Sequence, residues 1–94
     1  MFAINRNNGF SITFENGWTA SVQFGPGHYC QRRQDQSADF YGHNPSKGQE
    51  RWESTTAEIA AFKDDEWHDF GDDTVDGFVR PAEVLAFINL VAAK

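Results

Sequence analysis

The chain has 94 residues, 39% of them hydrophobic and nine of them phenylalanine, so it can fold as a single domain over residues 1–94. Its formal net charge of −6 argues against general binding to a DNA or RNA backbone. One cysteine excludes an intramolecular disulfide, and the sequence has neither a secretory signal nor an apolar run of transmembrane length. We therefore expect a cytoplasmic protein that does not enter a membrane.

Residues 10–24 contain two runs in which apolar and small polar residues alternate, separated by Asn16-Gly17. This pattern predicts a β-hairpin. A two-residue turn would place the apolar sets of the two strands on opposite faces. A three-residue turn, Glu15 to Gly17, instead pairs Phe14 with Trp18 and places both sets on one face. Burial of a large apolar side chain contributes roughly 1.5–3 kcal/mol, so we predict the three-residue turn.

Four further segments have the character of strands. Residues 2–6 read as a short first strand, and residues 75–79 as a bend or short extended piece. Residues 55–62 alternate, and a turn at Asp64-Asp65 would join them to a strand over residues 67–70. This second hairpin sets Phe62 opposite Trp67 and Lys63 opposite Glu66, one aromatic pair and one charge pair.

The end of the sequence predicts a helix over residues 82–93, with Pro81 at its first position and apolar residues around most of its circumference. We therefore expect this helix to be broadly buried. The predicted fold is α+β: a four- to five-stranded, mostly antiparallel sheet with the hairpin of residues 10–24 at its centre and the helix on one face. Phe62 and Trp67 on the other face indicate a second covered surface, which a homo-oligomer would supply.

Residues 25–52 follow neither period and form a long irregular insertion. The insertion holds four of the eight cations but three of the fourteen acids, which gives it a net charge of +1 against −7 for the rest. Aromatic rings stack on bases and guanidinium groups hold phosphate in two-point contacts, so the insertion predicts a site for a small, anionic, nucleotide-derived ligand. Alternatively, Arg32 and Arg33 pair with the chain's own carboxylates. The candidate ligand-binding residues are Tyr29, Arg32, Arg33, Tyr41, Arg51 and Trp52.

Two patterns resemble metal sites. Residues 72–83 resemble a twelve-residue calcium loop, although positions four and nine fit poorly and no helix precedes the loop; the alternative is a solvated acidic turn. A histidine–cysteine–histidine set could supply three zinc ligands but lacks a fourth. The residues concerned are Asp72, Thr74, Asp76 and Glu83 for calcium, and His28, Cys30 and His43 for zinc.

Catalytic motifs are weak in this sequence. Cys30 beside a histidine could act as a nucleophile with its base, but no oxyanion hole and no third, orienting residue can be identified. The sequence carries no Walker loop, no dinucleotide fingerprint and no zinc-protease motif. We therefore expect a non-catalytic protein without a cofactor.

The segments FENGWT (14–19) and SVQFGPG (21–27), Tyr29-Cys30, the acidic turn and the helix over residues 81–91 resemble small phage- and mobile-element-encoded proteins of unknown function. The resemblance implies a phage accessory protein in the cytoplasm of an infected bacterium and, by association, an anti-defence role such as sequestering a signalling nucleotide. One alternative is a protein–protein inhibitor whose acidic segment 64–76 covers a basic surface of a host protein. Another is a structural or assembly subunit.

Overall fold

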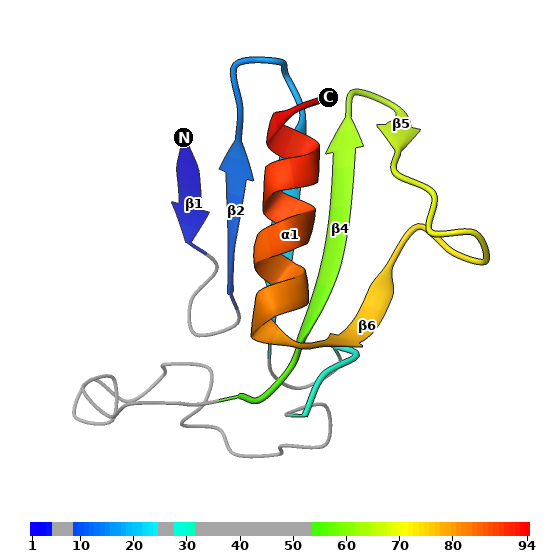
Figure 1. The fold of residues 1–94 in the computed structure, drawn as a ribbon. Coiled ribbons are helices and arrows are strands. Elements are labelled where there is room, and N and C mark those ends of the chain that lie inside the picture. The colour runs from blue at the N-terminus through cyan, green and yellow to red at the C-terminus, as the bar shows by residue number, and fades with distance from the viewer. Residues whose placement is uncertain (5–8, 25–27, 32–53) are drawn as a thin grey trace.

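The computed structural model describes residues 1–4, 9–24, 28–31 and 54–94, which form an antiparallel sheet with a helix on one face (Figure 1). This is the predicted α+β fold. The strands follow the order β1-β2-β3-β4-β5, and β6 also pairs with β4, so the predicted hairpin lies at the centre. The elements are β1 (Phe2–Ile4), β2 (Gly9–Thr13), β3 (Thr19–Gln23), β4 (Ala57–Lys63), β5 (Glu66–Trp67), β6 (Asp76–Val79) and α1 (Pro81–Ala92).

The turn of the central hairpin has the predicted three residues. The Phe14 N–H donates to the Trp18 carbonyl at 2.9 Å, and the Gly17 N–H donates to the Phe14 carbonyl at 3.0 Å. Gly17 has a φ of 88°, a left-handed conformation that favours glycine. The ladder then pairs Phe10 with Val22 and places the apolar residues of both strands on the face that α1 covers.

The second hairpin also has the predicted register. Phe62 pairs with Trp67, their ring centroids 5.0 Å apart, and Lys63 pairs with Glu66. The predicted extension of this strand through residue 70 is wrong, since β5 ends at Trp67. Beyond it, the rings of His68 and Phe70 lie against Phe87 of α1, and the backbone leaves the sheet to bring them there.

Within the described residues the sheet has six strands, one more than the upper end of the prediction. The extra strand is β6, which the sequence presented as a bend or short extended piece. Val79 pairs with Ala57 and Asp76 with Ile59, and the register shifts between these two pairs. A four-residue strand with an irregular ladder has too few residues for its alternation to be recognised in the sequence.

Helix α1 begins at Pro81, which occupies its first turn as predicted, and carries Glu83 there beside the positive end of the helix dipole. The expected broad burial is wrong. Phe87 and Val91 are buried, whereas Leu85 is 60% exposed and Leu90 is 49% exposed. A helix on one sheet face buries one stripe of its surface, here with Val84 and Ile88 partly buried at its border, and Leu85 and Leu90 fall outside this stripe.

The core lies between α1 and the central strands. On this face the turn of the β2–β3 hairpin also meets the C-terminus of the helix (Figure 1). Asn16 Nδ2 donates to the Val91 carbonyl at 2.9 Å, and Asn16 Oδ1 accepts the Trp18 N–H at 2.9 Å. The amide thus satisfies one of the carbonyls that a helix end leaves without a partner. The buried core residues are Ala20, Val22, Ala57, Ile59, Ala61, Val79, Phe87 and Val91.

The sheet face opposite α1 is polar over β2 and β3. Its register places Thr13 beside Thr19, with their hydroxyl oxygens 2.9 Å apart, and Ser11 beside Ser21. Phe62 and Trp67 lie together at one side of this face. In the part of the chain that the structure describes, no helix is long and apolar enough to cross a membrane.

Candidate functional site

Tyr29 is the one predicted ligand-binding residue within the described ranges. The other five lie outside them: Arg32, Arg33, Tyr41, Arg51 and Trp52. His43, the third ligand of the zinc hypothesis, lies outside them too, and so does most of the predicted insertion 25–52. The described residues 28–31 therefore show how one end of that insertion is held on the sheet.

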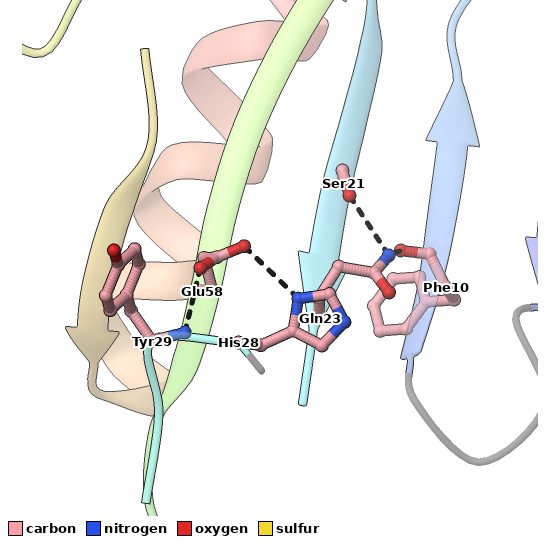
Figure 2. A network of polar contacts seen from close by, with 6 residues as sticks. All are labelled: Phe10, Ser21, Gln23, His28, Tyr29 and Glu58. Carbon is pink, nitrogen blue, oxygen red and sulfur yellow. Dashed lines mark hydrogen bonds and ion pairs between the residues drawn. The ribbon is translucent and has the colours of Figure 1, made fainter. Parts of the chain in front are cut away.

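Glu58 of β4 anchors this segment from the face opposite α1. Its Oε2 accepts the backbone N–H of Tyr29 at 2.8 Å, and its Oε1 lies 3.3 Å from Nδ1 of His28 (Figure 2). The Glu58 side chain is 15% exposed; its contact with His28 is partly buried, whereas its contact with the Tyr29 N–H is exposed. A carboxylate in this position holds the segment more firmly than a neutral acceptor would, because hydrogen bonds to a charged group are stronger.

Strand β6 also contacts residues 28–31, through the backbone of Tyr29. The Tyr29 carbonyl accepts the Phe78 N–H at 2.8 Å. A Cβ added at Gly77 would stand 2.5 Å from Cβ of Tyr29, so the close approach requires glycine. Phe78 has a φ of 53°, which is rare for an aromatic residue, and its side chain is 56% exposed. Glu58 and Gly77 together fix the backbone of Tyr29.

Gln31 makes the third attachment. Its backbone N–H donates to Thr56 Oγ1 at 2.9 Å, and its side-chain Oε1 accepts the Thr55 N–H at 2.8 Å. Between these attachments Cys30 is buried, with 1% of its surface exposed, which keeps its thiol away from a substrate in solution. This burial removes the access that the nucleophile hypothesis for Cys30 requires.

Gln23 and Ser21 of the neighbouring strand β3 make further polar contacts beside those of Glu58 (Figure 2). Gln23 Nε2 donates to Ser21 Oγ at 3.0 Å and to the Phe10 carbonyl at 3.4 Å. These contacts occupy the side chains of the polar sheet face at the same end of the sheet as Glu58. Together with the contacts of Glu58, these hydrogen bonds make this end of the sheet polar on the face opposite α1.

An apolar cavity of about 310 Å³ lies on the other side of the sheet, between β2, β3 and the first half of α1. Thr55 and Thr56, which bind Gln31, also line this cavity, so the attached segment and the cavity share a wall. The sequence did not indicate the cavity, because its walls come from five separate segments. The principal apolar lining residues are Phe10, Val22, Phe24, Val84, Leu85 and Ile88.

All four residues of the calcium hypothesis lie within the part of the chain that the structure describes. Asp76 begins β6, and Glu83 lies in the first turn of α1, where its Oε1 accepts Arg80 Nε at 2.7 Å. Among the described residues, no three side chains of His, Cys, Asp or Glu are grouped closely enough to hold a metal ion. Asp72 and Thr74 lie exposed between β5 and β6.

Two residues of the site were missed in the sequence. Glu58 lies within the alternating run of residues 55–62, and Gly77 lies within the stretch 72–83 that resembles a calcium loop. In the sequence, Glu58 is distinguished only as a carboxylate within an alanine-rich strand. Its hydrogen-bond partners are 29 and 30 residues away. No spacing rule relates residues that far apart.

Comparison of the chain with protein-family models, curated proteins and solved structures gives no match. The resemblance to phage proteins therefore stays a prediction.

Proposed function

We propose that the protein is a non-catalytic binding protein that takes an apolar or aromatic group of a small molecule into the cavity between α1 and the sheet. The cavity itself carries this proposal. Its volume of about 310 Å³ is at the lower end of the range typical of ligand sites. Its walls consist mainly of aliphatic and aromatic side chains, which favour burial of an apolar group over a charged one.

Burial of an apolar group in the cavity is by itself too weak to bind a ligand tightly. An inserted group that buries roughly 150 Å² of apolar surface gains about 4 kcal/mol at 25 cal/mol per Å², which corresponds to millimolar affinity before the cost of association. A specific ligand must therefore also contact polar or charged groups. The insertion begins beside the shared Thr55 and Thr56 wall and, by sequence, contains the cations that would make such contacts.

The finer proposal is that the ligand is a nucleotide-derived anion. It rests on the sequence, in which Arg32, Arg33 and Arg51 accompany Tyr41 and Trp52 in an otherwise acidic chain. With the phage resemblance, this proposal describes an accessory protein that sequesters a signalling nucleotide in the cytoplasm of an infected bacterium.

The test is calorimetric titration with a panel of mono-, di- and cyclic nucleotides and, separately, with anilinonaphthalene sulfonate as an apolar probe. Val84→Phe fills the cavity, and Leu90→Phe enlarges the exposed opposite side of the same helix as its matched control. Loss of binding in Val84→Phe, with Leu90→Phe unchanged, supports the cavity proposal. Binding that survives cavity filling contradicts it.

The nucleotide proposal is tested separately by Arg32→Ala combined with Arg33→Ala, with Lys63→Ala, at the end of β4, as a control cation outside the insertion. Nucleotide binding that falls at least tenfold in the arginine variant, with unchanged binding of the apolar probe, supports it. Unaltered nucleotide affinity contradicts the arginine assignment and leaves the cavity proposal standing.

A second candidate function is inhibition of a host protein through the acidic segment. All seven carboxylates of residues 64–76 are exposed, and they lie together along the β5–β6 side of the molecule. Their shared charge would steer the protein toward a basic surface. Association with such a partner should weaken steeply between 50 and 300 mM salt, in contrast to binding in an apolar cavity.

A further inference from the structure

Strand β1 forms one edge of the sheet, and its register shows which of its backbone groups point outward. The Met1 N–H donates to the Thr13 carbonyl at 2.8 Å, and the Thr13 N–H donates to the Met1 carbonyl at 2.8 Å. Such doubly bonded pairs alternate along an antiparallel ladder, so Ala3 and Ser11 form the next one. The N–H and C=O groups of Phe2 and Ile4 therefore point away from β2, and no described residue pairs with them.

Apart from its length of three residues, this edge lacks the features that usually prevent strand pairing. Residues 2–4 include no charge and no proline, and β1 pairs with β2 without a bulge. Phe2 is 70% exposed and Ile4 is 82% exposed. Their pairing opposite Ile12 and Phe10 places both side chains on the face that carries α1.

The charge of the molecule makes this edge the favourable one for a second copy. Residues 1–4 and 9–14 contain no charged side chain, whereas residues 64–76, on the β5–β6 side of the sheet, carry seven exposed carboxylates. Two copies of an acidic chain repel each other least where they meet away from these carboxylates. The charged group on the described β1 edge is the Met1 ammonium, which donates to the Thr13 carbonyl.

We propose that β1 pairs antiparallel with β1 of a second copy, about a two-fold axis at Ala3. Phe2 of each copy then lies opposite Ile4 of the other, and each of these pairs exchanges two backbone hydrogen bonds. The exposed Phe2 and Ile4 side chains of both copies meet on the helix-bearing face of one continuous sheet. The contact is self-complementary, as a two-fold interface requires. It differs from the contact through Phe62 and Trp67 that the sequence led us to expect.

The interface is small. Each Phe2 or Ile4 side chain offers on the order of 150 Å² of exposed surface, which places the whole contact near or below the lower end for specific complexes, ~1,200 Å². The dimer is therefore reversible and concentration-dependent, with a dissociation constant in the micromolar range or weaker.

Sedimentation equilibrium from 5 μM to 1 mM tests the proposal with two matched variants. Ile4→Lys and Leu90→Lys each replace an exposed apolar residue with the same cation, but Ile4 lies on the β1 edge whereas Leu90 lies on α1. We expect Ile4→Lys to raise the dissociation constant at least tenfold and Leu90→Lys to change it less than threefold. A wild-type chain that stays monomeric at 1 mM, or equal effects of the two variants, overturns the proposal.

Cross-linking tests the register independently. In the proposed dimer Ala3 faces Ala3 of the second copy in a closely spaced pair, within the Cα separation that a disulfide spans. The two Ser11 residues are separated by about three strand spacings, or ~14 Å. Mild oxidation should therefore dimerise Ala3→Cys and leave Ser11→Cys monomeric, while the natural Cys30 is buried in both. Equal cross-linking of the two variants contradicts the register, and the sedimentation test does not depend on either cysteine variant.

Discussion

The two edges of the sheet differ in charge and in exposed apolar surface. The β1 edge has no charged side chain among residues 1–4, and its apolar residues Phe2 and Ile4 are exposed. The β5–β6 side carries the seven exposed carboxylates of residues 64–76. Charged side chains on an edge prevent pairing with another sheet, so the chain protects one edge and leaves the other able to associate.

The two edges also differ in how they are joined to the helix. On the acidic side, His68 and Phe70 lie with ring centroids 5.5 and 5.3 Å from that of Phe87. On the other side, β1 is joined to β2 by the ladder and by a Phe2–Phe10 contact with centroids 6.5 Å apart. The acidic side is thus a part of the core, and the β1 edge is a peripheral addition to it.

The largest expected difference in stability is between two truncations to alanine. Phe87→Ala removes a ring that is 7% exposed and should lower the free energy of unfolding by about 3 kcal/mol, since buried Phe→Ala changes typically cost 3–5 kcal/mol. Phe2→Ala should cost less than about 1 kcal/mol in the monomer, because exposed positions contribute little. Urea denaturation at low micromolar concentration measures both. Similar losses would show that the two edges are equally integrated.

A pair of glycines tests the attachment of the β1–β2 region to β3. Both Gly9 and Gly71 have positive φ, 145° and 109°. A Cβ at Gly9 would stand 2.1 Å from the Val22 carbonyl oxygen, whereas at Gly71 it meets nothing within 4 Å. Gly9→Ala should therefore be the more destabilising by about 2 kcal/mol, since the backbone strain is common to both. Equal thermal denaturation midpoints for the two variants would contradict the steric argument.

Asn16 joins the turn of the β2–β3 hairpin to the C-terminal end of α1 by hydrogen bonds. Asn16→Ala removes the donor to the Val91 carbonyl and the acceptor for the Trp18 N–H, and should cost about 1–2 kcal/mol. Glu15→Ala, at an exposed neighbour in the same turn, should change stability by less than about 0.5 kcal/mol. Equal chemical denaturation midpoints for these variants would mean that the amide contributes nothing to the helix end.

The smallest effect is a pH dependence confined to the acidic side. Burial lowers the pKa of His68 from its usual 6.5, the charge of Lys94 adds to this lowering, and Asp69 opposes it. The unfolded chain therefore binds the proton more readily than the folded one. This contribution to stability is complete above pH 6.5 and is lost as the pH falls through the folded pKa.

His68→Phe keeps a ring against Phe70 and Phe87 but removes the titration. Between pH 7.5 and 5, the urea midpoint of the wild type should fall more than that of His68→Phe. Parallel pH profiles for the two proteins would exclude His68 as the source.

The sequence by itself determined the local parts of the fold. Alternation within residues 10–24 and the need to bury both apolar sets together selected the three-residue turn. The pairing of Phe62 with Trp67 followed from a short turn, and Pro81 marked the helix start. Each of these features depends on residues no more than 14 positions apart, where periodicity and turn chemistry constrain the backbone directly.

The tertiary structure decided everything that joins distant segments. It paired β6 with β4, turned His68 and Phe70 toward the helix, and left Leu85 and Leu90 exposed. It also attached Tyr29 to Glu58 and formed the cavity from five separate segments. Sequence patterns do not encode such contacts, because they depend on how completed elements pack. Five of the six predicted ligand residues lie outside the described ranges, and their role stays a prediction.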